Sequence, residues 1–158
     1  MRSSWLLCAA LLAAVAPLGP LQAQTPDEQA VRAVVDRMFD GMRRGDSVAV
    51  RSVFHPQARL QTTAVRDGRL MVREDSISAF VRAVGTPHEQ VFDERISNVV
   101  IHIDGPLALA WMDYSFHLGD RFSHCGVNLF QLVRSPGEDW KVLSIIDTRR
   151  REGCPGAG

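Results

Sequence analysis

Residues 107–134, LALAWMDYSFHLGDRFSHCGVNLFQLVR, alternate apolar and polar side chains on either side of Gly119-Asp120. Alternation with a period of two is typical of β-strands, and a short connection that contains glycine favours a hairpin. A two-residue turn pairs Leu118 with Arg121 and fixes the register of both strands. The segment therefore predicts two long antiparallel strands, which end at Leu118 and begin again near Phe122.

Strand-like segments also flank this hairpin. Residues 88–103 end at the turn Asp104-Gly105-Pro106, and residues 140–148 follow the turn Ser135-Pro136-Gly137. Consecutive antiparallel pairing of these strands is the simplest topology.

The N-terminal half is mainly helical. Thr25-Pro26-Asp27-Glu28 is typical of a helix start, with Thr25 as cap, proline in the first turn and Glu28 closing a capping box. A second, short helix follows Asp46, residues 60–72 favour a hairpin around Asp67-Gly68, and a third helix begins near Asp75. The first helix has an apolar stripe at helical spacing, formed by Val31, Val34, Val35, Met38, Phe39 and Met42. Helices followed by strands predict an α+β domain with the helices on one face of a curved antiparallel sheet.

Length and charge limit the class of protein. The chain has 158 residues, with 18 basic and 18 acidic side chains. This balance argues against a nucleic-acid-binding protein, which normally has a basic excess on one face. We expect one domain at residues 24–150 and a C-terminal tail at residues 151–158.

The first 23 residues are typical of a cleaved signal peptide, with an uncleaved membrane anchor as the alternative. Arg2 precedes an apolar segment from Trp5 to Leu18, and Ala23 suits cleavage. We therefore expect an exported protein, periplasmic or extracellular, without membrane attachment after cleavage. Cys125 and Cys154 then remain, either as a disulfide that ties the tail to the domain or as two separate thiols.

Hairpin pairing predicts one polar face with aromatic members. Its candidate ligand-binding residues are Trp111, Asp113, Ser115, His124, Asn128, Phe130 and, from the last strand, Asp147. Three interpretations stay open: a solvated sheet face, a ligand pocket without catalysis, and an acid–base site. In the third, Asp113 holds the imidazole of His124 as a general base. No metal or cofactor motif is present, so we expect neither.

Several local motifs resemble the nuclear transport factor 2-like superfamily. They are Met38-Phe39-Asp40-Gly41, Phe54-His55-Pro56, His124-Cys125-Gly126 and Trp140-Lys141-Val142, in this order along residues 27–148. The superfamily includes SnoaL-like cyclases, ketosteroid isomerase, scytalone dehydratase and lumazine-binding-type exported domains. The resemblance implies a cone-shaped, cystatin-like fold with three N-terminal helices on a curved antiparallel sheet, and a homodimer.

The resemblance does not decide the activity, because this fold serves many functions. The catalytic residue sets of the superfamily find no matching motif here. We expect an exported domain that binds an unknown small molecule in its cone without catalysis. The first alternative is a metal-independent lyase or isomerase that uses Asp113 and His124. The second is a structural homodimer whose cone is filled by side chains.

Overall fold

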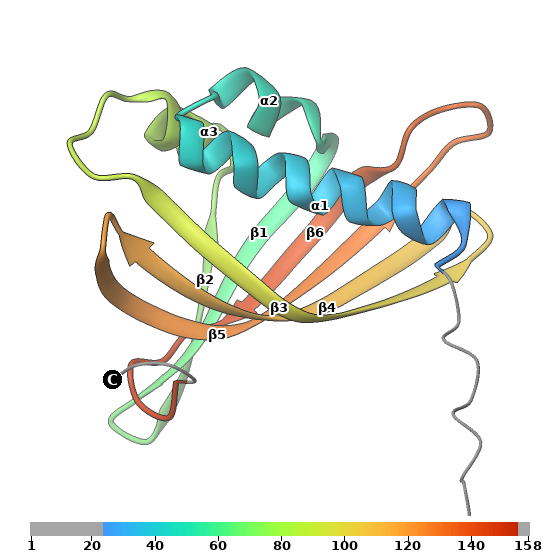
Figure 1. The fold of residues 1–158 in the computed structure, drawn as a ribbon. Coiled ribbons are helices and arrows are strands. Elements are labelled where there is room, and N and C mark those ends of the chain that lie inside the picture. Colours follow the sequence, from blue (N-terminus) through green and yellow to red (C-terminus); the bar gives the residue numbers. More distant parts are fainter. Residues whose placement is uncertain (1–23, 155–158) are drawn as a thin grey trace, which may run out of the picture.

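The longest helix lies across the concave side of a curved six-stranded sheet (Figure 1). A computed structural model of the chain describes residues 24–154. The predicted signal peptide at residues 1–23 and the end of the tail, residues 155–158, lie outside the described residues. Within the described part, no helix is both long and apolar enough to cross a membrane.

Helix α1, Pro26–Arg44, begins as the sequence predicts. Thr25 Oγ1 accepts a hydrogen bond from the backbone N–H of Glu28 at 3.2 Å, and the Glu28 carboxylate accepts one from Thr25 N–H at 2.6 Å. The helix ends at Gly45, whose φ of 65° is accessible to glycine at little steric cost. The predicted apolar stripe packs against the sheet, with the rings of Phe39 and Phe130 5.8 Å apart.

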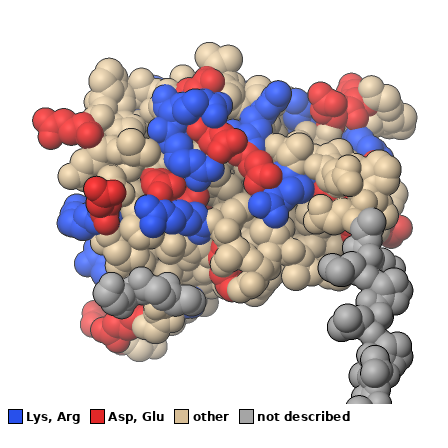
Figure 2. Space-filling model, in the orientation of Figure 1, with Lys and Arg blue, Asp and Glu red and all other residues tan. Residues whose placement is uncertain are grey.

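Two short helices complete the helical layer. Helix α2, Ser47–Ser52, starts at Asp46, which accepts a hydrogen bond from Ala49 N–H at 2.8 Å. Helix α3, Ile77–Gly85, starts at Ser76 and follows the first hairpin of the chain. On the face of the molecule shown in Figure 2, basic and acidic side chains intermingle. On α1 they form the ion pairs Arg32–Asp36 and Arg43–Asp40.

Six strands form one sheet in the order β2-β1-β6-β5-β4-β3. Their bounds are β1 Phe54–Arg66, β2 Arg69–Asp75, β3 Phe92–Asp104, β4 Leu107–Leu118, β5 Arg121–Val133 and β6 Lys141–Thr148. The α+β class and the antiparallel run from β3 to β6 agree with the sequence-based expectation. The expectation of a wholly antiparallel sheet is wrong, because β1 pairs in parallel with β6.

The hairpin between β4 and β5 departs from the predicted register by one residue. Leu118 pairs with Arg121 as expected, but Phe116 pairs with His124, so Ser123 is an extra residue in β5. An inserted residue of this kind is a β-bulge, and it reverses the facing of every residue beyond it. His124 consequently shares a face with Tyr114 and Phe116, whose rings lie 5.8 and 5.0 Å from its own.

The C-terminal segment is held against β5. Arg150 exchanges two backbone hydrogen bonds of 2.9 Å with Cys125, and Cys125 forms a disulfide with Cys154. Gly126 lies under the same segment, where an added Cβ would stand 1.8 Å from the carbonyl oxygen of Thr148. β5 and the end of β6 can approach this closely only because residue 126 has no side chain.

Candidate functional site

The residues of the predicted polar face divide between the two sides of the sheet. Trp111, Asp113 and Ser115 lie on the convex side, away from α1, whereas the bulge turns His124 to the concave side. Trp111 is 49% exposed there. Asn128 and Phe130 pair with Met112 and Ala110, which belong to the buried core, so they also lie on the concave side.

The predicted catalytic pair does not form. The Asp113 carboxylate accepts a hydrogen bond of 2.8 Å from the side-chain amide of Asn98, on the convex side. His124 lies on the other side of the sheet between two aromatic rings. Burial, with Arg149 and Arg151 nearby, lowers the pKa of His124 to about 4. The imidazole is therefore neutral near pH 7 and has no carboxylate from Asp113 to orient it.

A cavity of about 200 Å³ lies between the helices and the concave side of the sheet. Asn128, Phe130 and Asp147, three of the predicted ligand-binding residues, line it together. Its apolar wall is formed by Met38, Met42, Leu60, Phe80, Phe130 and Ile145. Its polar lining is formed by Thr62, Arg73, Asp75, Glu94, Tyr114, Asn128, Asp147 and Arg149.

Asp147, which is 6% exposed, is the hydrogen-bonding centre of the polar lining. Its Oδ1 accepts a hydrogen bond from the Thr62 hydroxyl at 2.6 Å, and its Oδ2 lies 3.0 Å from the Tyr114 hydroxyl. The guanidinium of Arg149 stands 3.7 Å from the same carboxylate. Burial and the charge of Asp147 raise the pKa of Tyr114, so its hydroxyl keeps its proton.

Glu94 is the second carboxyl group in the cavity. Its Oε1 accepts a hydrogen bond of 2.7 Å from the side-chain amide of Asn128. The side chain keeps partial exposure, but surrounding protein atoms desolvate the carboxylate, and this burial raises its pKa to about 7. The hydrogen bond from Asn128 acts in the opposite direction and is outweighed. Glu94 therefore exchanges a proton near neutral pH, as groups that serve as acids and bases in enzymes do.

The remaining charges of the cavity lie on exposed residues. Arg73 forms an ion pair of 2.8 Å with Asp75, and Arg149 faces Asp147. Because both arginines are exposed, the cavity reaches solvent beside β2 and the end of β6. Among residues 24–154 no group of three or more candidate metal ligands lies close enough to hold an ion.

Sequence reasoning missed Glu94, Tyr114 and Thr62. Tyr114 lies on the face opposite Asp113, and the carboxylate that its hydroxyl reaches is Asp147. Glu94 had a usable signal, since it lies two positions before Ile96 in a predicted strand, and alternation with a period of two puts both side chains on the same face. Thr62 had none, because its contact depends on the parallel pairing of β1 with β6.

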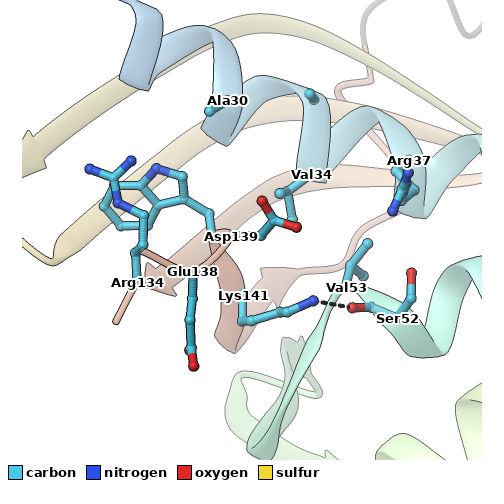
Figure 3. Close-up of a pocket in the computed structure, with 11 residues that line it drawn as sticks. Ala30, Val34, Arg37, Ser52, Val53, Arg134, Glu138, Asp139 and Lys141 are labelled. Carbon is cyan, nitrogen blue, oxygen red and sulfur yellow. Dashed lines mark hydrogen bonds between the residues drawn. The ribbon is translucent and has the colours of Figure 1, made fainter. Parts of the chain in front are cut away.

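A second pocket of about 280 Å³ lies between α1 and the connection between β5 and β6 (Figure 3). Two of its three basic groups already have partners: Arg134 binds Asp27 and stacks 4.6 Å from the Trp140 ring, and Lys141 donates to the carbonyl of Ser52 at 2.8 Å. The third, Arg37, is exposed. Trp140 is 2% exposed and belongs to the hydrophobic core. These contacts have a structural role, so the internal cavity is the stronger candidate site.

Comparisons with known proteins agree with this architecture. Residues 26–145 match the model of the family described as "Putative lumazine-binding". None of the curated proteins matches the chain. A nuclear transport factor 2-like protein of unknown function from Shewanella baltica is 21% identical, with 82% of this chain and all of that chain covered and a TM-score of 0.61.

Two further solved structures show the same fold. A nuclear transport factor 2-like protein with a cystatin-like fold from Novosphingobium aromaticivorans is 12% identical, with 83% and 86% of the two chains covered and a TM-score of 0.62. A Streptomyces avermitilis protein described as a "putative dehydratase" of the nuclear transport factor 2-like family is 18% identical, with 80% and 99% covered and a TM-score of 0.55. Identities this low establish the fold and leave the activity open.

Proposed function

The chain belongs to the family described as "Putative lumazine-binding", with a nuclear transport factor 2-like fold, and on this basis we propose that it binds a small organic molecule in the cavity under α1. One observation carries the proposal: an apolar wall faces a polar lining in a cavity that the core side chains leave open. A mainly apolar pocket with a few convergent polar groups is the usual form of a small-molecule site.

The proposal is tested by native mass spectrometry of protein purified from its own cells without added ligand. A co-purified small molecule, released on denaturation, supports the proposal and gives the mass of the ligand. Lumazine, the compound named in the family description, is the first probe for protein that is purified empty.

Methionine methyl resonances locate the bound probe. Met38 and Met42 line the cavity, whereas Met71 is exposed on β2 and serves as the internal control. We expect the first two methyl signals to shift on binding and that of Met71 to stay in place. Saturable shifts at Met71 alone would place the ligand elsewhere and contradict the proposal.

A second function has one specific observation in its favour. Glu94 titrates near pH 7 inside the cavity, where it could transfer a proton in a metal-independent lyase or isomerase reaction. The Streptomyces protein described as a "putative dehydratase" shares the fold. The test is exchange of a C–H of the recovered ligand for deuterium in D₂O. Loss of this exchange in Glu94→Gln supports catalysis, and equal exchange in both proteins contradicts it.

We also propose that two copies pair through the convex side of the sheet. Val100, Leu109 and Trp111 are 47%, 37% and 49% exposed there, and a contiguous apolar surface of this kind favours a protein contact. Light scattering after size exclusion tests the proposal. We expect a dimer that Trp111→Ser dissociates, whereas Val48→Ser, at an exposed position on α2, leaves it intact. A monomeric wild-type protein would contradict it.

Export is proposed from the sequence of residues 1–23. The expected mature protein begins at Gln24, next to the helix cap Thr25. Intact-mass measurement of the cell-envelope or culture fraction checks the cleavage, and full-length protein confined to the cytoplasm would contradict it.

A further inference from the structure

We infer that the cavity selects a ligand whose polar end is a hydrogen-bond-donating cation, such as a primary ammonium group, attached to a compact apolar body. The inference rests on the proposed binding function and specifies the class of molecule that the same cavity takes. It follows from three features of the lining: the use of its donors, the pairing of its charges, and the size of its apolar wall.

The donors of the neutral polar side chains in the lining are already engaged with acceptors. The hydroxyl of Thr62 donates to Asp147 at 2.6 Å, and the hydroxyl of Tyr114 has Asp147 and the Thr148 carbonyl as its acceptors. The side-chain amide of Asn128 donates to Glu94. In the part of the chain that the structure describes, Glu94 Oε2 accepts no hydrogen bond. Apart from the guanidinium groups of the exposed residues Arg73 and Arg149, the lining therefore offers acceptor positions, and the ligand has to supply donors.

The charges of the lining leave one carboxylate without a cation. Arg73 pairs with Asp75 and Arg149 with Asp147, and the charge of Arg149 also acts on Glu94 from beyond ion-pair distance. Within the described residues no lysine, arginine or histidine nitrogen forms an ion pair with the Glu94 carboxylate, whose hydrogen-bond donor is the neutral amide of Asn128. An ionised carboxylate in such a place is unfavourable until a cation compensates it. An anionic ligand would bring a second negative charge close to the Glu94 carboxylate, and the repulsion between the two charges would exclude it.

The apolar wall sets the size of the ligand body. Two flexible methionines, Met38 and Met42, stand with Phe80 and Phe130 around about 200 Å³ of space. This space accommodates a single ring or a short branched chain beside the cationic group. Methionine side chains adapt their shape to such a body more readily than branched residues do.

Binding of an ammonium group requires Glu94 to be ionised, so affinity depends on pH. The titratable and charged groups that face Glu94 are Asp147 and Arg149 on β6, Tyr114 on β4, and Arg73 and Asp75 on β2, while Arg43 of α1 donates to the backbone carbonyl of Glu94. With a pKa of about 7, the carboxyl group is mostly protonated at pH 5.5. The affinity for an ammonium probe should fall about thirtyfold between pH 8 and pH 5.5.

Three probes of similar shape test the inference by calorimetry at pH 8: cyclohexylmethylammonium, cyclohexylmethanol and cyclohexanecarboxylate. We expect the ammonium to bind at least about tenfold more tightly than the alcohol, and the carboxylate not to bind. Glu94→Gln keeps the acceptor for Asn128 and removes the charge, so it should abolish the difference between ammonium and alcohol. Glu89→Gln, at an exposed position outside the cavity, is the matched control and should preserve the difference.

The outcomes separate this inference from the proposed function. Equal or tighter binding of the alcohol or the carboxylate overturns the cation preference and leaves small-molecule binding intact. An ammonium preference that persists in Glu94→Gln also overturns it, since the selecting group would then be another one. If none of the three probes binds and the protein also purifies without a ligand, the binding function fails and the inference fails with it. The pH dependence in the wild-type protein tests the inference even if the variant does not fold.

Discussion

Replacing Glu94 with glutamine should stabilise the protein at pH 8 and leave its stability at pH 4.5 nearly unchanged. Burial raises the pKa of Glu94 from an ordinary 4.5 to about 7, so the folded protein holds a proton that the unfolded chain releases. The stability that this proton provides is fully present below pH 4.5 and is lost as the pH rises through 7. This difference between the folded and unfolded pKa of Glu94 corresponds to about 3 kcal/mol in the free energy of unfolding. The measured effect should be smaller, because water reaches the partly exposed carboxylate.

His124 has the opposite effect on the pH dependence. Its pKa falls from 6.5 to about 4 on folding, so the unfolded chain binds a proton that the folded protein does not. Stability from this group is present above pH 6.5 and is lost as the pH falls towards 4. Between pH 4.5 and 6.5 the contributions of Glu94 and His124 therefore oppose each other. The wild-type protein should show a nearly flat stability profile in this range.

Urea denaturation from pH 4.5 to pH 8 separates the two contributions. Glu94→Gln should become more stable as the pH rises to 6.5, because only the His124 contribution remains. His124→Gln should become less stable over the same range, because only the Glu94 contribution remains. The packing against Phe116 that this variant loses lowers its stability at every pH and does not change this slope. Glu89→Gln, on the surface, should follow the wild type. If Glu94→Gln is no more stable than the wild type at pH 8, or is stabilised equally at both ends of the range, the reasoning about Glu94 is refuted.

Three other substitutions test the architecture around the site. Cys154→Ser should lower the free energy of unfolding, measured by chemical denaturation, by about 3 to 4 kcal/mol, since the disulfide joins residues 29 positions apart. Reduced wild-type protein is the control and should lose a similar amount. Gly126→Ala should lower the free energy of unfolding by about 3 kcal/mol or more, or prevent folding, because its Cβ would meet the Thr148 carbonyl oxygen. Gln131→Ala, at an exposed position in the same strand, should have little effect. If Gly126→Ala is as stable as the wild type, the strands around residue 126 are less closely packed than the structure shows. Phe130→Ala should lower the free energy of unfolding by about 3 to 5 kcal/mol and enlarge the cavity. A decrease below about 1 kcal/mol would mean that the contact between Phe130 and Phe39 is not part of the core.

Local signals in the sequence predicted most of the elements. The capping box at Thr25, the apolar stripe of α1 and the turn at Gly119-Asp120 depend on residues a few positions apart, and each is present in the structure. β1 begins at Phe54, earlier than expected, since the chain leaves α2 directly into a strand. The proline at position 56 lies at the start of that strand, a position where proline is tolerated.

Two features of the structure had no local signal. Parallel pairing of β1 with β6 joins residues 85 to 88 positions apart, so neither strand alone indicates its partner. The bulge at Ser123 adds one residue to a hairpin whose turn was correctly assigned. Because side chains alternate with a period of two, this single residue was enough to separate Asp113 from His124.

The two errors together explain why only part of the cavity could be predicted. Asn128, Phe130 and Asp147 were assigned to one face, and they do line one cavity, because the bulge moved Asn128 and Phe130 together. The partners that give Asp147 its hydrogen bonds come from β1 and β4, and Glu94 comes from the far edge strand β3. The polar lining is thus complete only when every strand of the sheet is in register. A change that loosens the β1–β6 pairing should therefore weaken ligand binding by removing the Thr62 hydroxyl from Asp147, even where it touches no cavity residue.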